Sequence, residues 1–151
     1  MEFQGVYNNA IDAKGRASIP ARFREQLKEL CDDDALIVTQ DRSGIVAYPP
    51  SEWKIFLDKF AQLPNDQFRE DLYFTTVTPA THCTFDKQGR IQLPQSLREY
   101  CQLDTDGVRD VVIVGGANKI QIWNKSRYQE MLAEAEQRQV EARQKRIDLG
   151  L

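Results

Sequence analysis

The chain has 151 residues, enough for one ordinary domain or two very small ones, and its 41% of hydrophobic residues exclude a disordered protein. No apolar run approaches the roughly 18 residues that a membrane span needs, and the first residues lack the features of a secretory signal, so we expect a cytosolic protein with no membrane partner. The net charge of −3 means that binding to nucleic acid would require positive charge concentrated at one place.

A 14-residue motif occurs twice in the chain. Residues 12–25 align without gaps on residues 86–99, at an offset of 74 residues. The identical pairs are Asp12 and Asp86, Gly15 and Gly89, Arg16 and Arg90, Pro20 and Pro94, Arg24 and Arg98, and Glu25 and Glu99. At an offset of 75 the similarity continues, with residues 36–38 matching 111–113 and residues 45–48 matching 120–123. The sequence therefore predicts one structural unit present in two copies.

In chain order, each copy is predicted to contain a strand, a tight turn, a strand, a short helix and two further strands. In the turn, the aspartate can accept hydrogen bonds from backbone amides ahead of it, and the glycine can adopt a positive φ. Residues 16–19 then alternate as a short strand, and Pro20 suits the first turn of a helix. Phe23, Leu27 and Leu30 are spaced to form one buried face of that helix.

Helical segments are predicted after each copy. The first begins near Ser51 and ends before Pro64, and a second, shorter one lies around Phe68. The tail is helical from about Asn124 until its apolar stripe fades beyond Ala142, where we expect a frayed and solvated end. The predicted segments are a first domain at 5–50, a helical connector at 51–79, a second domain at 80–123, and a C-terminal helix and tail at 124–151.

Neither copy is large enough to form a stable hydrophobic core alone. One copy spans about 50 residues, which is near the lower limit for an independent core. Turn-rich residues at 40–44 and 115–118 predict a hairpin between the last two strands of each copy. We therefore expect the two copies to pack around a pseudo-two-fold axis as one interlocked β-rich pair.

Positive charge is concentrated around the first motif. Residues 10–28 carry five basic side chains against two acidic ones, whereas residues 84–100 carry three against two. Arg16 and Arg90 directly follow the glycine of each turn, where a guanidinium group can bind a phosphate as a fork or reach guanine O6 and N7 in the major groove. Lys14 would supply a more flexible phosphate contact. The sequence thus predicts DNA-binding turns.

A structural role for the arginines remains open. Each turn arginine could instead pair with the aspartate of its own turn and merely pin the turn. Arg24 and Arg98 each follow a buried helical residue, a position where an arginine commonly lies along the surface or bonds a neighbouring strand, so we favour a structural or mixed role for them.

The two motifs resemble the paired signature of the MraZ family. The residues that carry the resemblance are Asp12-x-Lys-Gly-Arg-x-x-x-Pro-x-x-x-Arg24 and Asp86-x-x-Gly-Arg-x-x-Leu-Pro-x-x-Leu-Arg98, together with Tyr-Pro-x-x-Glu-Trp at 48–53. The length, the duplication and the trailing helix also agree. The resemblance implies an α+β fold, built as a β-rich pseudo-two-fold pair of AbrB-like swapped-hairpin barrels with short flanking helices.

The resemblance also implies a function. The family consists of bacterial transcription regulators that assemble into rings, are cytoplasmic and nucleoid-associated, and recognise short direct repeats in double-stranded DNA. Such a regulator typically represses the division and cell-wall gene cluster that contains its own gene. A homo-oligomeric ring would gain avidity by engaging several repeats at once.

The matching motif positions assign DNA contact to Lys14, Arg16 and Arg90. Arg22 and Lys87 are further candidates, because they add positive charge to the first and second copy respectively. The second copy departs from the first, since Gln88 replaces the lysine and Ser96 replaces Arg22. Asp12, Gly15, Asp86 and Gly89 are predicted to be structural turn residues.

Other classes of function are less well supported. One aspartate per copy would suit a carboxylate dyad, but each is followed by Gly-Arg rather than by the Ser/Thr-Gly arrangement of aspartic proteases, and no Gly-x-Ser-x-Gly or Walker motif is present. We therefore expect no catalytic residue, cofactor or small-molecule substrate. Cys31, Cys83, Cys101 and the single histidine His82 do not form a metal-binding or disulfide pattern. A protein-binding scaffold or antitoxin-like module that uses the same basic turns stays open as the alternative.

Overall fold

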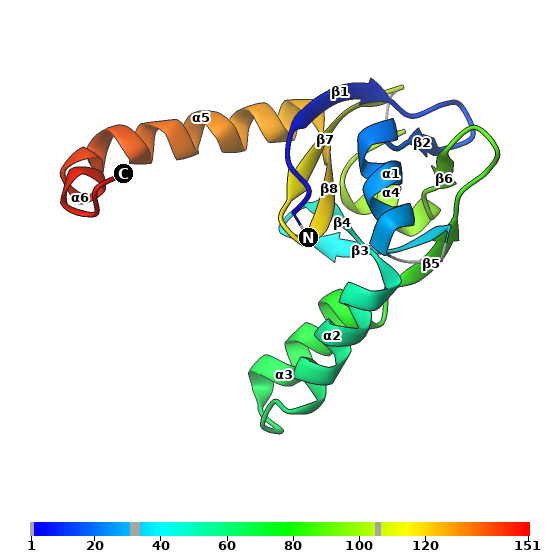
Figure 1. Ribbon diagram of the computed structural model, residues 1–151, viewed down its shortest axis with the longest axis horizontal. Helices are drawn as coiled ribbons and strands as arrows, with labels where there is room; N and C mark the ends of the chain where they lie inside the picture. Colours follow the sequence, from blue (N-terminus) through cyan, green and yellow to red (C-terminus); the bar gives the residue numbers. More distant parts are fainter. Residues whose placement is uncertain (1, 31–33, 105–106) are drawn as a thin grey trace.

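The computed structural model describes residues 2–30, 34–104 and 107–151, and it has an α+β fold, as predicted (Figure 1). The first copy contains β1 (Val6–Ala10), β2 (Arg16–Ser18), α1 (Ala21–Leu30), β3 (Ala35–Asp41) and β4 (Gly44–Tyr48). The second contains β5 (Thr81–Thr84), β6 (Arg90–Gln92), α4 (Gln95–Tyr100), β7 (Asp110–Gly116) and β8 (Lys119–Asn124). Between the copies lie α2 (Pro50–Ala61), α3 (Gln67–Leu72) and the π-helix η1 (Tyr73–Val77), and after them α5 (Lys125–Glu141) and α6 (Arg143–Asp148).

Both predicted hairpins are present. In the first, β3 and β4 are joined by a two-residue turn between Asp41 and Gly44. Arg42 and Ser43 in this turn have φ values of 47° and 71°, which match the right-handed twist of the flanking strands. The β7–β8 hairpin closes in the same register, between Gly116 and Lys119.

The two copies exchange strands within one antiparallel sheet of order β1-β7-β8-β4-β3-β5. The first strand of each copy pairs with the hairpin of the other, β1 with β7 and β5 with β3. The remaining short strands, β2 and β6, pair with each other in a separate two-stranded sheet. The strands outside the hairpins are β1 and β2 in the first copy and β5 and β6 in the second. Each of them pairs with a strand of the other copy.

Two strand pairs define the pseudo-two-fold axis. Where β4 meets β8, Val46 lies opposite Gln121, which is its equivalent at the offset of 75 residues. Where β2 meets β6, Ala17 lies opposite Ile91, its equivalent at the offset of 74 residues. A residue that pairs with its own equivalent lies on the symmetry axis, so the axis passes through both pairs.

The copies share one hydrophobic core. Phe23 and Leu27 of α1, Leu97 of α4, and Ile45 and Ile120 of the central strands are at most 2% exposed and belong to the same buried cluster. Because burial of apolar surface is the main stabilising contribution to folding, the two copies stabilise one another.

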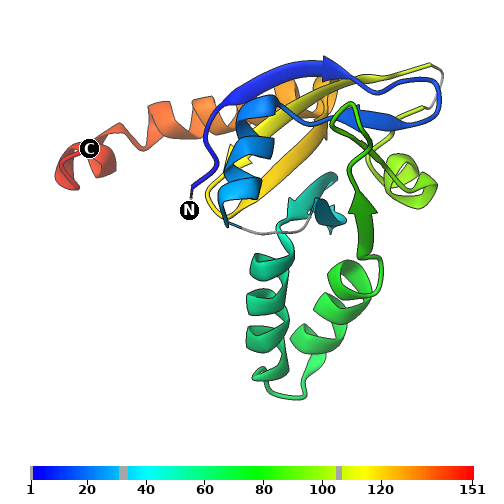
Figure 2. The ribbon, with the colours of Figure 1, turned by 45° about the vertical axis from the view of Figure 1, so that its right-hand side comes forward.

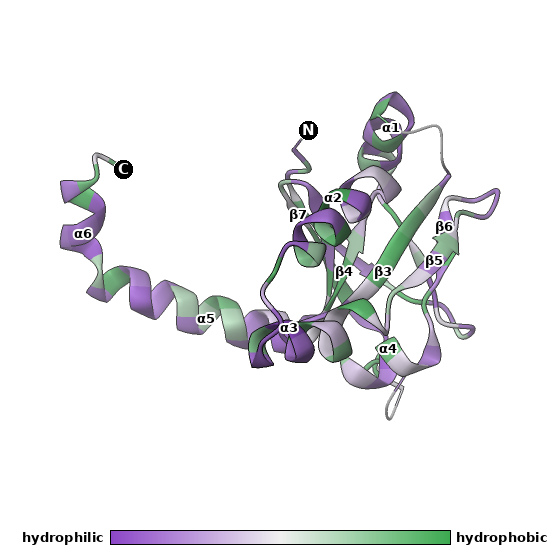
Figure 3. Ribbon diagram, turned by 90° about the horizontal axis from the view of Figure 1, so that it is seen from below, coloured by the Kyte–Doolittle hydropathy of each residue, from purple (hydrophilic) through white to green (hydrophobic). Residues whose placement is uncertain are grey.

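Two helical arms leave the sheet in different directions (Figures 1 and 2). The hairpin of α2 and α3 is anchored where Trp53 is buried against Tyr48 of β4, with ring centroids 5.4 Å apart. The α5 helix extends away from the sheet and has no fully buried residue. Figure 3 shows apolar residues concentrated on β3, whereas α5 alternates between polar and apolar residues. Within the described ranges, none of the helices combines the length and apolar character that crossing a bilayer requires.

Two sequence predictions about helices are wrong. Leu30 is 48% exposed instead of buried, because it is the last residue of α1 and the core side of the helix is already filled by Phe23 and Leu27. The segment beyond Ala142 is exposed as predicted but helical rather than frayed. It lacks glycine or proline before Gly150, and Gln144 donates a side-chain hydrogen bond one turn ahead, so a short helix forms.

Candidate nucleic-acid interface

The first turn is built around the carboxylate of Asp12. Its Oδ1 accepts hydrogen bonds from the backbone amides of Lys14 at 3.0 Å and Arg16 at 2.9 Å, and its Oδ2 accepts one from Arg16 Nε at 2.6 Å. Gly15 has a φ of 79°, a conformation that favours glycine. The bond from the Arg16 amide is the main cause that lowers the pKa of Asp12 to about 2, so the carboxylate is ionised at neutral pH.

The second turn repeats this geometry. Asp86 accepts hydrogen bonds from the backbone amides of Gln88 and Arg90, both at 2.9 Å, and from Arg90 Nε at 2.8 Å. Gly89 has a φ of 76°. As in the first turn, the bond from the arginine amide is the main cause that lowers the pKa of Asp86. The aspartate and the glycine of the second turn therefore have the same geometry as those of the first.

The pairing of β2 with β6 places the two turns side by side, at the end of the molecule away from α5 (Figures 1 and 2). The Leu93 amide donates to the carbonyl of Gly15 at 3.1 Å. Arg90 Nη1 lies 3.6 Å from Asp12 Oδ2, so the guanidinium group of the second copy reaches the carboxylate of the first. The two arginines thus belong to one cluster.

Four of the five predicted DNA-contact residues lie on these paired turns. Lys14 and Lys87 are exposed, while the side chains of Arg16 and Arg90 are 30% and 23% exposed. Arg22 lies outside the turns, exposed in the first turn of α1, and within the described part of the chain no polar contact joins it to them. The turns therefore present a basic surface formed by Lys14, Arg16, Lys87 and Arg90, and Arg22 is not part of it.

Both interpretations of the turn arginines are compatible with this geometry. In Arg16, Nε is engaged by Asp12, whereas the terminal guanidinium nitrogens have no hydrogen-bond partner among the described residues. The ion pair therefore orients the guanidinium plane and leaves its terminal N–H groups able to donate. A fork held in this way suits a phosphate or the edge of a guanine.

One residue that joins the turns was not predicted from the sequence. Gln92 of β6 donates through Nε2 to the carbonyl of Lys14 at 2.7 Å, so the second copy holds the turn of the first. No repeat signal pointed to it, because its equivalent in the first copy is Ser18. Arg24 and Arg98, by contrast, recur in both copies, and each donates through Nε to a main-chain carbonyl, at 3.0 and 3.1 Å.

The cysteines and the histidine form no reactive site in the part of the chain that the structure describes, where no group of three potential metal-ligating side chains occurs. Burial raises the pKa of Cys83 to about 11 and that of Cys101 to about 12, so both thiols are protonated at neutral pH. His82 is exposed on the opposite face of β5 from Cys83. Cys31 lies outside the described residues.

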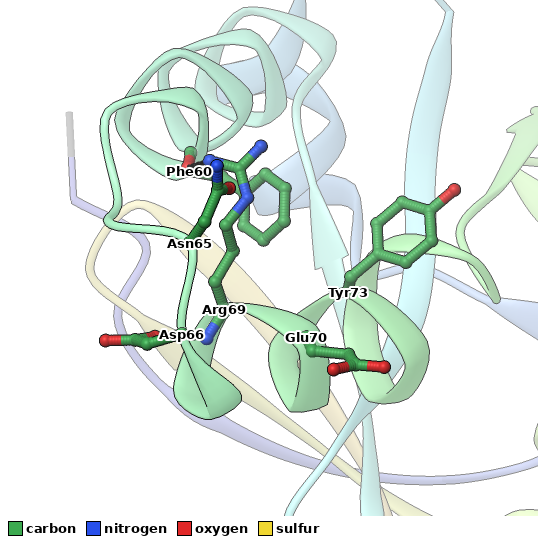
Figure 4. Close-up of a pocket in the computed structure, with 6 residues that line it drawn as sticks. All are labelled: Phe60, Asn65, Asp66, Arg69, Glu70 and Tyr73. Carbon is green, nitrogen blue, oxygen red and sulfur yellow. Dashed lines mark hydrogen bonds between the residues drawn. The ribbon is translucent and has the colours of Figure 1, made fainter.

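A cavity of about 390 Å³ lies on the α2–α3 hairpin (Figure 4). This hairpin projects away from the end of the molecule that carries β2, β6 and the turns (Figure 1). The cavity is lined by Phe60, Asn65, Asp66, Arg69, Glu70 and Tyr73. Arg69 Nη1 donates to the carbonyls of Phe60 at 3.2 Å and Leu63 at 3.0 Å, and its Cζ lies 4.7 Å from the centre of the Phe60 ring. The guanidinium group thus satisfies carbonyls at the C-terminal end of α2, which is a structural role. The paired turns remain the candidate functional site.

Comparisons with known proteins agree with the duplication. The family model described as "MraZ protein, putative antitoxin-like" matches residues 3–73 and again residues 76–149. A protein named Transcriptional regulator MraZ from Syntrophotalea carbinolica is 47% identical over 136 residues, which cover 90% of each chain. Proteins of the same name from Pediococcus pentosaceus and Desulfitobacterium hafniense are 36% and 37% identical over 151 residues, or 99% of each chain.

Proposed function

The chain belongs to the MraZ family, and from this premise we propose that it is a transcriptional regulator that binds duplex DNA through its paired turns. It is a regulator and not an enzyme. Its targets are short direct repeats in the promoter of the division and cell-wall gene cluster that contains its own gene, which it represses. It acts in the cytoplasm, associated with the nucleoid.

The observation that carries this proposal is the pairing of two basic turns on one edge of the molecule. Lys14 and Lys87 supply flexible phosphate contacts, while Arg16 and Arg90 present oriented guanidinium groups. Contacts to phosphate position a protein on the duplex, and contacts to base edges give selectivity. Arg22 adds a phosphate contact at the side of the turns.

The strand exchange supports the proposal that each copy is an AbrB-like domain of the swapped-hairpin type. β1 of the first copy completes the sheet beside β7, and β5 of the second completes it beside β3. In this division the domains are residues 5–50 and 80–123, joined by the helical connector 51–79 and followed by the C-terminal helix and tail 124–151.

Assembly into a homo-oligomeric ring would give one DNA molecule several turn pairs to bind. A single pair can contact only a few base pairs, so its binding should be weak unless repeated copies add avidity. The arm formed by α2, α3 and η1 carries apolar side chains that neighbouring copies would cover. Phe68 and Phe74 are 64% and 61% exposed, and burial of such apolar side chains against another chain is favourable.

A protein-binding module remains the second candidate, because the matching family model carries the description "putative antitoxin-like". In that function the basic turns would meet acidic side chains of a partner protein. Binding to DNA in the absence of any other protein, with a strong dependence on salt, would favour the regulator.

The proposal is tested by fluorescence anisotropy with DNA from upstream of the gene and a scrambled duplex of equal length and composition. Wild type, Arg16→Ala and Arg90→Ala are titrated at two salt concentrations. We expect each substitution to weaken selective binding by roughly ten-fold or more, since one good bidentate base contact accounts for about that factor.

The matched control is Arg138→Ala, which removes the same charge from the exposed surface of α5. It should bind as the wild type does. The proposal is wrong if the wild type fails to distinguish the two duplexes, or if Arg16→Ala and Arg90→Ala remain folded and bind like the control.

A further inference from the structure

Arg24 and Arg98 each lie across the turn of the other copy, and we propose that they are positioning residues that lock the two turns into one recognition unit. Neither needs to touch DNA for this role. The inference rests on the proposed function, because it assigns these arginines a part in setting the spacing of the DNA-binding groups.

A closed loop of contacts links Arg98 to the first turn. The Gly15 carbonyl accepts a hydrogen bond from the Leu93 amide at 3.1 Å, and the Leu93 carbonyl in turn accepts one from Arg98 Nε at 3.1 Å. The guanidinium group then lies directly against the glycine, since a Cβ added to Gly15 would be 2.5 Å from Arg98 Cζ. The second copy therefore holds the first turn through both its backbone and its arginine.

The equivalent set of contacts, related by the pseudo-two-fold axis, links Arg24 to the second turn. The Gly89 carbonyl accepts a hydrogen bond from the Ile19 amide at 3.1 Å, and the Ile19 carbonyl accepts one from Arg24 Nε at 3.0 Å. A Cβ added to Gly89 would be 2.5 Å from Arg24 Cζ. Each turn is thus held by an arginine from the helix of the other copy. We call this contact, in which the guanidinium group lies on the turn glycine and Nε donates to a carbonyl, the brace.

The surroundings of these arginines favour support over direct contact with DNA. Both are half-buried, their Nε atoms are engaged by main-chain carbonyls, and one guanidinium face is covered by a glycine. Arg98 is held further by an ion pair between its Nη1 and Asp104. Its side chain is 17% exposed, against 30% for the turn residue Arg16.

The brace requires the shape of arginine as well as its charge. A planar guanidinium group can lie flat on a glycine while its Nε–H donates to a carbonyl at the side, whereas a lysine ammonium is a compact, strongly hydrated charge without this geometry. It follows that lysine at either position should keep the charge but lose the brace.

Loss of a brace should have a particular signature in DNA binding. The turn that is no longer held would shift relative to its partner, so Arg16 and Arg90 could not reach their targets together. Binding to the target duplex should weaken by roughly ten-fold, the value of one good base contact. Binding to scrambled DNA should stay unchanged. The salt slope, which is the fall in the logarithm of the binding constant with the logarithm of salt concentration, should also stay unchanged. Loss of a direct phosphate contact would instead lower this slope by about 0.9.

The experiment compares Arg24→Ala, Arg24→Lys, Arg98→Ala and Arg98→Lys with wild type, using the full chain and the two duplexes described above. Arg138→Ala is again the charge-matched control. All four variants are expected to lose selectivity at an unchanged salt slope. In amide NMR spectra, Arg24→Ala should shift the Gly89 resonance of the other copy, and Arg98→Ala should shift that of Gly15.

Several results would overturn the inference. Full selectivity in the lysine variants would show that charge alone suffices, and a smaller salt slope would show direct phosphate contact. If the alanine variants unfold, the lysine variants decide the matter, and unfolding of both kinds would assign the arginines to the fold instead. If Arg16→Ala loses selectivity while the Arg24 and Arg98 variants keep it, only this inference fails. If wild type itself is not selective, the proposed function fails first.

Discussion

Asp12 and Asp86 each accept three hydrogen bonds from the turn that they close, two from backbone amides and one from an arginine Nε. The backbone bonds do not depend on the identity of the residues that donate them. The turn should therefore keep its conformation when the arginine is replaced, and a loss of DNA binding by Arg16→Ala can be attributed to the lost guanidinium group.

The pKa of Asp12 tests this division between backbone and side chain. In the wild type it should be about 2, well below the ordinary value of 3.8. In Arg16→Ala it should rise but stay below 3.8, because the main cause, the bond from the backbone amide, is retained. An NMR titration of the side-chain carboxyl measures both values, and Arg138→Ala should leave the value unchanged. A return to 3.8 in Arg16→Ala would mean that the guanidinium group alone orders the turn.

The same pKa gives a sign for the dependence of stability on pH. Because the folded state lowers the pKa of Asp12, ionisation of this carboxyl stabilises the fold fully above 3.8, and this contribution is lost as the pH falls towards 2. Asp86 contributes with the same sign. Chemical denaturation between these pH values should show stability falling with acidity, and less steeply in Asp12→Asn.

Gln88 offers a gain-of-function prediction. Its side chain is exposed at the position where the first copy has Lys14, so Gln88→Lys would give the second turn the same phosphate-binding charge. We expect tighter binding to DNA at low salt and a salt slope that is steeper by about 0.9. Gln137→Lys is the matched control, because it adds the same charge to the exposed surface of α5. Equal effects from the two substitutions would show that only net charge matters.

At the scale of elements, the α2–α3 arm is joined to the sheet by a buried hydrogen bond as well as by its aromatic anchor. Thr39 of β3 is fully buried and donates through Oγ1 to the carbonyl of Thr76 in η1 at 2.6 Å. A buried carbonyl that loses its donor is costly, because it has been removed from water without compensation. This bond should therefore stabilise the π-helical end of the arm.

Thr39→Val removes the donor while keeping the shape of the side chain. We expect it to lower the free energy of unfolding by about 1–3 kcal/mol, the cost of an unsatisfied buried acceptor. Thr78→Val is the matched control, since the Thr78 hydroxyl donates to the carbonyl of Phe74 in an exposed setting, and it should change stability by less than about 0.5 kcal/mol. Urea denaturation compares the two. Equal losses would mean that the bond from Thr39 does not hold the arm.

The elements that could be predicted from the sequence are those with local causes. The Asp-x-x-Gly turns follow from aspartate capping and the positive φ of glycine, and the two hairpins follow from turn-rich residues between apolar strands. The C-terminal α6 helix was missed because apolar periodicity, the main signal used, is absent there. The pairing of β1 with β7 and of β3 with β5 could not be predicted, since strand partners distant in sequence leave no local pattern.

The candidate site divides in the same way. The residues of each turn were predicted, because repetition in two copies makes them visible. Their arrangement was not, because the contact of Arg24 with Gly89 depends on how β2 meets β6. The repeat identified Arg24 and Arg98 as one equivalent pair, and the two turn glycines as another. It did not indicate that each arginine contacts the glycine of the other copy.

At the scale of the molecule, the two copies serve as partners for one another. Separating them would leave β1 without β7, β3 without β5 and β4 without β8. Only the β3–β4 or β7–β8 hairpin would remain in each half, and an isolated two-stranded hairpin is marginally stable in water. Neither half should therefore fold as a monomer.

Pseudo-symmetry nevertheless gives the first half a way to fold, because a second copy of residues 1–79 could occupy the place of the second half. The axial pairs would then be Val46 with Val46 and Ala17 with Ala17, both compatible with a buried position, as these residues are at most 2% exposed. We expect this fragment to form a homodimer whose melting temperature rises with protein concentration.

Residues 80–151 should dimerise less well, since the axis would bring together two copies of Gln121, a polar residue that is only half-buried in the full chain. Circular dichroism melts over a range of concentrations, with sedimentation to give the mass, measure both fragments. A folded monomer of residues 1–79 with a concentration-independent melting temperature would contradict the argument, because it would show that one copy completes its own sheet.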